Sequence, residues 1–130
     1  MMKANPPSTI DVLLAISDKL SIDIITSISN HVTKPDDLIR ILKITPKQYY
    51  SRSSRLSNLG LVSRRNGEII LTSLGRLVYK AQSKIATAFS HISELTMIDA
   101  IKSHSGMSEV EQKRIIDKLL DGSELTNLVA

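Results

Sequence analysis

Residues 45–75 decide the fold, and they read TPKQYYSRSSRLSNLGLVSRRNGEIILTSLG. Thr45-Pro46 is typical of a helix start, because threonine caps a helix and proline suits its first position. Gly60 suits a helix end. Asn66-Gly67, between two short apolar runs, is a strong signal for a two-residue hairpin turn. The stretch therefore predicts a helix over 46–59, then a two-stranded hairpin, then another helix.

The turn at Asn66-Gly67 fixes which residues face each other across the hairpin. The expected pairs are Arg65 with Glu68, Arg64 with Ile69, and Val62 with Leu71. The apolar members then share one face and can anchor the hairpin to a core, while the two arginines lie near its tip. This pattern is typical of a wing.

The region before residue 45 predicts shorter helices. Ser8 or Thr9 can cap a first helix that runs to about Leu20. The isoleucine-rich segment over 21–28 permits a strand by propensity, but its spacing also fits a helix, which we favour. Pro35 then opens a short helix through about Lys43, and Asp36-Asp37 complement its N-terminal dipole.

The region after residue 71 predicts a long helix and a final one. Thr72 can cap a helix from about Leu74 to Ser103. Ser108 with Glu111 forms a capping-box pattern for a last helix to about Leu120. The long helix carries a heptad-like apolar stripe: Leu74, Val78, Ala81, Ile85, Ala88, Ile92 and Leu95.

Composition limits the classes of protein that the chain can belong to. Its 130 residues are 42% hydrophobic, which is enough for a modest core. The absence of cysteine excludes disulfides, thiolate metal sites and thiol catalysis. The segment before Ser8 lacks a signal-peptide pattern, and the run Val12–Ile16 is too short to cross a bilayer. We therefore expect a cytoplasmic protein with no membrane partner.

Charge is segregated along the chain. Residues 34–84 carry eleven Lys and Arg against three acidic residues, whereas the rest carries six basic and ten acidic residues. Such a basic middle is the pattern expected of a nucleic-acid-binding face. We expect double-stranded DNA as the partner.

The helix over 46–59 places Tyr49, Ser53 and Leu56 on one side. The opposite side and its flanks carry side chains suited to a major groove, and the hairpin tip adds two arginines. The expected DNA-binding residues are Lys47, Gln48, Tyr50, Ser51, Arg52, Ser54, Arg55, Asn58, Arg64 and Arg65. Tyr50 is equally suited to packing, and a basic face that is merely solvated is the alternative for any single arginine.

The apolar stripe of the long helix extends beyond what a small domain can cover. An exposed stripe of this kind usually finds a partner. We expect a two-fold homodimer, which also suits DNA half-sites. The expected dimerisation residues are Ile85, Phe89, Ile92 and Leu95.

Several stretches resemble winged-helix regulators of the ArsR-like family that are common in archaeal genomes. They are Thr45–Arg52, Leu56–Val62, Asn66-Gly67, Leu71–Gly75, and Ile16-Ser17-Asp18 followed by Ile24-Ile25. The resemblance covers about residues 10–80. It implies a dimeric DNA-binding repressor or activator. Ser53 departs from the family pattern, which places an aliphatic core residue there, and this departure would loosen the packing of the helix over 46–59 against its neighbours.

The expected fold class is mainly α with a small β-hairpin wing: a winged helix-turn-helix domain, a long C-terminal helix and a short final helix. The expected organisation is a flexible N-terminus over 1–7, the DNA-binding domain over 8–80, a helical dimerisation arm over 81–122 and a tail over 123–130.

No catalytic or cofactor pattern stands out. The five glycines are scattered, no serine sits in a nucleophile-elbow pattern, and His31, His91 and His104 lack metal-ligand spacing. We expect no enzyme, cofactor or metal. The alternative function is a winged-helix adaptor for a protein partner. A repressor that senses a small molecule between winged domain and arm is a third hypothesis, and the sequence names no effector.

Overall fold

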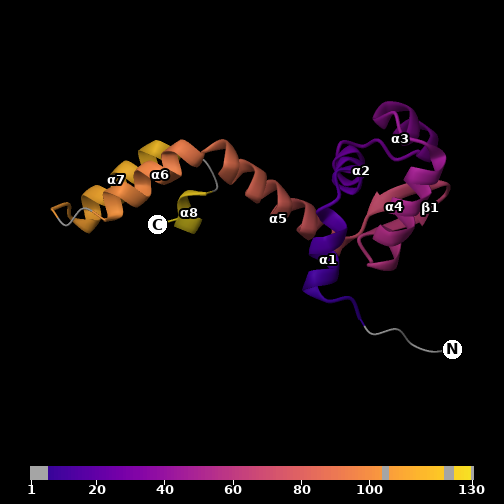
Figure 1. The fold of residues 1–130 in the computed structure, drawn as a ribbon, viewed down its shortest axis with the longest axis horizontal. Coiled ribbons are helices and arrows are strands. Elements are labelled where there is room, and N and C mark those ends of the chain that lie inside the picture. Colours follow the sequence, from indigo (N-terminus) through magenta and orange to yellow (C-terminus); the bar gives the residue numbers. More distant parts are fainter. Residues whose placement is uncertain (1–5, 104–105, 122–124, 130) are drawn as a thin grey trace. The chain divides into compact units, whose positions relative to one another are not determined.

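A computed structural model describes residues 6–103, 106–121 and 125–129 (Figure 1). The described part is mainly helical with one two-stranded antiparallel hairpin, which confirms this part of the predicted fold class. The elements are α1 (Thr9–Ile16), α2 (Lys19–Ser29), α3 (Pro35–Leu42), α4 (Pro46–Asn58), β1 (Val62–Arg65), β2 (Glu68–Leu71), α5 (Ser73–Ser90), α6 (Ile92–Lys102), α7 (Glu109–Leu120) and α8 (Thr126–Val129).

The chain divides into two compact units, residues 1–79 (unit 1) and 80–130 (unit 2). The division falls within α5. The N-terminal segment expected to be flexible lies largely outside the described residues, as does part of the expected tail.

The N-terminal helices of unit 1 correct one prediction. The first helix ends at Ile16 and not near Leu20, because Asp18 starts a new helix. Its carboxylate accepts a hydrogen bond from the Ser21 N–H at 3.1 Å and so caps α2. The isoleucine-rich segment is helical, as favoured, and it buries Ile24, Ile25 and Ile28.

The hairpin has the predicted register, with Arg65 opposite Glu68 and Val62 opposite Leu71. Asn66 and Gly67 both have positive φ, 54° and 78°, as this type of tight turn requires. The outer edge of β2 is tied to the α2–α3 connection, because the Ile69 N–H donates to the Thr33 carbonyl at 2.8 Å. Strand β2 is therefore hydrogen-bonded on both edges, to β1 and to the α2–α3 connection.

Thr72 starts α5, as predicted. Its hydroxyl accepts from the Gly75 N–H at 3.0 Å and donates to the Gly60 carbonyl. Gly75 is required at its position, because a Cβ there would lie 1.9 Å from the Leu61 carbonyl oxygen. This close approach seats α5 directly on the chain that leads into the hairpin.

The core of unit 1 is built from aliphatic side chains and one tyrosine. Its buried members come from α2, α3, α4 and the hairpin: Ile24, Ile25, Ile28, Leu38, Tyr49, Leu56, Leu61, Val62, Ile69 and Leu71. Val78 and Tyr79 of α5 pack against this cluster. The first turns of α5 thus belong to unit 1.

The predicted single helix over 74–103 is wrong, because it is interrupted at His91. The backbone of His91 has φ −112° and ψ 26°, and its N–H bonds to Ala88 instead of Thr87. The Thr87 carbonyl is taken by side chains: the Ser90 hydroxyl donates to it at 2.6 Å, and His91 Nδ1 lies 3.0 Å away. Side chains that replace a backbone donor in this way break a helix.

Unit 2 has a small core made by Ile98, Ile116, Leu120 and Leu125. Ser108 caps α7 through the Glu111 N–H at 3.2 Å, but the return bond from the Ser108 N–H to the Glu111 side chain, which the predicted capping box needs, is not formed. Leu125 lies in the segment that the sequence assigns to a tail, yet it is buried in this core. No helix among the described residues is long and apolar enough to cross a membrane.

Candidate nucleic-acid interface

Helix α4 carries the candidate site, and its orientation is fixed by its buried side. Tyr49, Ser53 and Leu56 are buried, as the helical spacing predicts. The Ser53 hydroxyl lies 3.5 Å from the Tyr50 carbonyl, and α4 continues unbroken through this serine. Burial raises the pKa of Tyr49 above its ordinary value. The opposite side of α4 consequently faces solvent.

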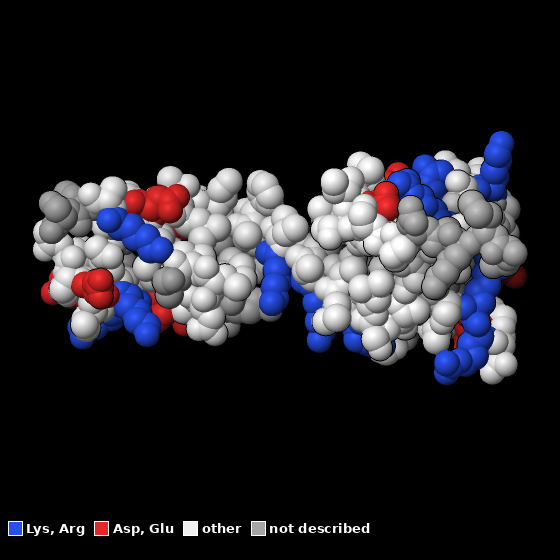
Figure 2. Space-filling view, turned by 90° about the horizontal axis from the view of Figure 1, so that it is seen from below, with Lys and Arg blue, Asp and Glu red and all other residues white. Residues whose placement is uncertain are grey.

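The solvent face of α4 presents most of the residues that the sequence selects for DNA contact. Those exposed are Lys47, Tyr50, Ser51, Ser54, Arg55 and Asn58, and Arg64 and Arg65 are exposed on the hairpin. In Figure 2, Lys and Arg side chains lie at the upper and lower edges of the visible face of unit 1, with acidic side chains beside the upper group. On unit 2, basic and acidic side chains lie close together.

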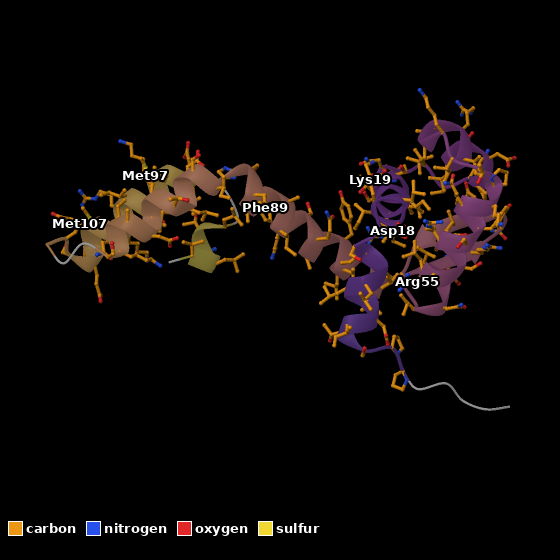
Figure 3. All side chains as sticks on the ribbon, viewed as in Figure 1. Asp18, Lys19, Arg55, Phe89, Met97 and Met107 are labelled. Carbon is orange, nitrogen blue, oxygen red and sulfur yellow. The ribbon has the colours of Figure 1, made fainter. Side chains whose placement is uncertain are left out.

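Four cationic side chains of this surface form no ion pair with the described residues. Within 6–103, 106–121 and 125–129, ion pairs join Lys19 to Asp23, Arg40 to Asp37, and Arg52 to Asp18. The cations on α4 and at the hairpin tip that form none of these ion pairs are Lys47, Arg55, Arg64 and Arg65. Figure 3 labels Arg55 on α4. Unpaired exposed cations are available to neutralise an anionic partner.

The charge of Arg55 also affects the pKa of a carboxyl group near the start of α1. The Ser8 backbone and hydroxyl hydrogen bonds hold the pKa of Asp11 below its ordinary value, and the Arg55 charge adds a smaller lowering. Arg55 forms no ion pair with this carboxylate, and its side chain stays exposed on α4.

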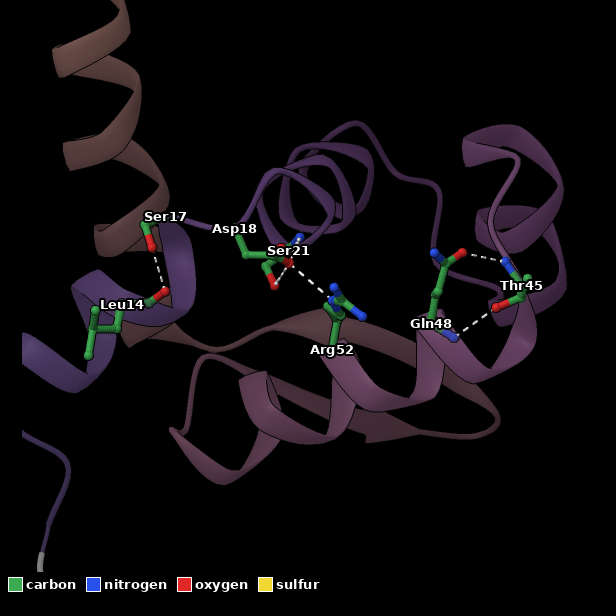
Figure 4. Close-up of polar contacts among 7 residues, drawn as sticks. All are labelled: Leu14, Ser17, Asp18, Ser21, Thr45, Gln48 and Arg52. Atoms are coloured by element: carbon green, nitrogen blue, oxygen red, sulfur yellow. Dashed lines mark hydrogen bonds and ion pairs between the residues drawn. The ribbon is translucent and has the colours of Figure 1, made fainter.

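Gln48 is only partly available, which the sequence did not predict. Thr45 and Gln48 form a capping box (Figure 4): the Gln48 side-chain oxygen accepts from the Thr45 N–H at 2.9 Å, and the Thr45 hydroxyl accepts from the Gln48 N–H at 3.1 Å. Reading an adenine edge with glutamine needs both the oxygen and the amide nitrogen. The cap therefore competes with such a contact.

Arg52, which the sequence places on the flank of the DNA-binding face, forms an ion pair within the protein. Its Nε lies 3.1 Å from Asp18 Oδ2, and its side chain is 32% exposed (Figure 4). This hydrogen bond is the largest of the effects that hold the pKa of Asp18 below its ordinary value. The partner was not identified from the sequence, because it is 34 residues away.

Tyr50 is exposed and still packs, so both possibilities considered for it have a structural basis. Its ring meets the Tyr49 ring edge-on, with centroids 4.9 Å apart. The Arg64 guanidinium lies 5.8 Å from the Tyr50 ring centroid, which is within the range of a cation–π contact. This contact links the hairpin to α4, so both elements present one surface.

The expected dimerisation residues are exposed with one exception. Ile85, Phe89 and Ile92 are each more than half exposed, and Phe89 is labelled in Figure 3. Leu95 is half-buried against the core of unit 2. A depression of about 210 Å³ lies among Ala88, Phe89, Ile92 and Leu95.

A second apolar surface was missed from the sequence. Ile10, Leu13 and Leu14 are exposed on α1, because Val12, Ala15 and Ile16 supply its inward side. A pattern of mostly apolar residues on a short helix did not reveal which of them face solvent.

Residues suited to metals do not gather in the described part of the chain. No group of three or more His, Asp or Glu side chains that could hold an ion occurs there. His104 of the histidine set lies outside the described residues.

The chain matches no family model, no curated protein and no solved structure.

Proposed function

We propose that residues 8–80 form a winged helix-turn-helix domain that binds double-stranded DNA and regulates transcription in the cytoplasm. In this proposal α4 enters the major groove and the hairpin is the wing, which contacts the adjacent backbone or minor groove. The order of helices, the hairpin after α4, and the resemblance to ArsR-like regulators all support this assignment.

The observation that carries the proposal is the composition of one exposed surface. Lys47, Arg55 and Arg65 have no ion pair among the described residues, and they accompany exposed Ser51, Ser54 and Asn58. Cations supply affinity for phosphates, and serine and asparagine hydrogen-bond to phosphates or base edges. A polar face that is merely solvated is the alternative, and the variants below distinguish it from a DNA-binding face.

The protein would act as a homodimer through unit 2. Phe89 and Ile92 are large, apolar and exposed, and a second copy offers an identical apolar surface. A two-fold dimer would present two α4 helices to half-sites about one helical turn apart.

The test is fluorescence anisotropy with a random-sequence duplex, titrated with salt. Arg55→Ala/Arg65→Ala is compared with Lys113→Ala/Arg114→Ala, which removes the same charge from exposed positions of α7. The account predicts salt-sensitive binding that the first variant lowers at least tenfold and the second leaves nearly intact. Equal losses would mean that only net charge matters, and no binding by the folded wild type would refute the proposal.

A protein partner is the second candidate, because Ile10, Leu13 and Leu14 are exposed on α1. An adaptor would use this surface and leave the basic face unused. Leu13→Asp would then abolish partner binding, while Arg55→Ala/Arg65→Ala would not affect it.

A further inference from the structure

The contact between Asp18 and Arg52 joins two helices that are separate in sequence. Asp18 precedes α2, and Arg52 lies in the middle of α4. One carboxylate oxygen, Oδ2, accepts from Arg52 Nε at 3.1 Å, from the Ser21 N–H at 3.1 Å and from the Ser21 hydroxyl at 2.9 Å (Figure 4). Asp18 is itself held by α2, so it is a fixed partner for the arginine.

The ion pair leaves the other end of the guanidinium unused. Within the described chain, Arg52 makes its hydrogen bond through Nε, and its terminal nitrogens make none. The pair borders a hollow of about 280 Å³, which is also lined by Ser21, Ser51 and Arg55. The terminal nitrogens are therefore available to an acceptor from outside the protein.

A guanidinium held at one edge is pre-organised at the other. Arginine reads guanine through two parallel hydrogen bonds, which require a defined orientation of its planar group. A free arginine at the same place would attract phosphates equally well but would discriminate less, because it must order its side chain on binding.

We infer that Asp18 is a positioning residue that orients Arg52 toward a base edge and so controls the sequence preference of α4. This inference rests on the proposed function. Asp18 makes no contact with DNA in this account. Its negative charge weakens attraction to phosphates, so it exchanges general affinity for selectivity.

The experiment selects preferred sequences from a randomised duplex library, using wild type, Asp18→Asn and Arg52→Lys. Asparagine keeps the helix cap but loses the negative charge that holds Arg52, and lysine keeps the positive charge but lacks the planar guanidinium, so the first variant weakens the hold on Arg52 and the second removes the held group. Ser21→Ala is the control, because it removes a bond to Asp18 and leaves the ion pair. Thermal melts verify that each variant is folded.

The inference predicts that Asp18→Asn and Arg52→Lys relax the preference at the same base position by about tenfold or more. Asp18→Asn should also bind random duplex at least as tightly as wild type. Ser21→Ala should keep the preference. If Asp18 had only a structural role, its substitution would lower the affinity for selected and for random duplexes together. A loss of preference without a loss of affinity for random duplex is therefore evidence for positioning.

Two results would overturn the inference. If Asp18→Asn keeps the wild-type preference, or loses affinity for all duplexes in parallel, Asp18 does not position Arg52 for reading, although DNA binding stands. If folded wild type selects no duplex, the proposed function itself fails, and the inference fails with it.

Discussion

Units 1 and 2 differ in what they bury and in what they present. Unit 1 packs ten buried residues of its described part into its core and carries eleven basic against six acidic side chains. Unit 2 buries four such residues among those described, carries six basic against seven acidic side chains, and exposes Phe89 and Ile92. Both units expose apolar side chains, Ile10, Leu13 and Leu14 in unit 1 and Phe89 and Ile92 in unit 2. The excess of basic over acidic side chains is therefore what distinguishes the surface of unit 1, and it is the property that attracts a polyanion.

The largest expected effect is on stability, from a substitution where α5 lies closest to the Leu61 backbone in unit 1. Gly75→Ala places a methyl group 1.9 Å from the Leu61 carbonyl oxygen, so the backbone must move. We expect the free energy of unfolding to fall by about 3 kcal/mol or more. Urea unfolding measures it, and Gly106→Ala, with open space around it, should change it by less than about 0.5 kcal/mol. Similar effects of the two substitutions would contradict the packing described for α5.

The next effect concerns the apolar surface of unit 2. Phe89→Asp puts a charge on the proposed dimer contact and should raise the dimer dissociation constant about thirtyfold or more. Sedimentation equilibrium measures this constant. Leu13→Asp makes the same kind of change on α1 in unit 1 and should leave it unchanged. If Leu13→Asp dissociates the dimer and Phe89→Asp does not, the dimer forms through α1.

A smaller effect is expected inside the core of unit 1. The Tyr49 hydroxyl is buried, and no described residue bonds it at full hydrogen-bond distance and angle, although it interacts with the Ser53 side chain. Tyr49→Phe removes this incompletely compensated group and should stabilise the protein by about 1 kcal/mol. Chemical denaturation measures the change, and Tyr50→Phe serves as the exposed neighbour, with an expected change below about 0.5 kcal/mol. A destabilised Tyr49→Phe variant would show that the hydroxyl is fully hydrogen-bonded.

The smallest effect is a pH dependence at the contact between α2 and α4. The Arg52 hydrogen bond lowers the folded-state pKa of Asp18. The ionised Asp18 carboxylate therefore stabilises the folded protein fully above the unfolded-state pKa of about 4. This stabilisation is lost as the pH falls through the folded-state pKa. The stability difference between wild type and Asp18→Asn, measured by urea unfolding, should shrink below about pH 4. A difference that does not change with pH would contradict the ion pair.

Local sequence patterns predicted most of the secondary structure of unit 1, but they did not predict the contacts between residues that are far apart in the sequence. Asn66-Gly67 fixed the hairpin register because a two-residue turn allows one pairing. The spacing of Tyr49 and Leu56 predicted which side of α4 is buried. The Asp18–Arg52 pair depends on packing between helices, which no local pattern encodes.

Unit 2 was predicted less well, because side-chain competition decided its helices. The stripe through Ile85 and Ile92 predicted one helix, but Ser90 and His91 take the Thr87 carbonyl and end it. Likewise, no periodicity marks Leu125 as a core residue, since it stands alone beyond α7.

The most direct test of the central claim is an NMR titration of labelled protein with duplex DNA at low salt. The account predicts the largest amide shifts over 47–58 and at Arg64 and Arg65, reversed by added salt, with little change around Phe89. Shifts confined to α1 or to the Phe89 surface, or none at all, would contradict the assignment of α4 and the hairpin as the DNA-binding surface.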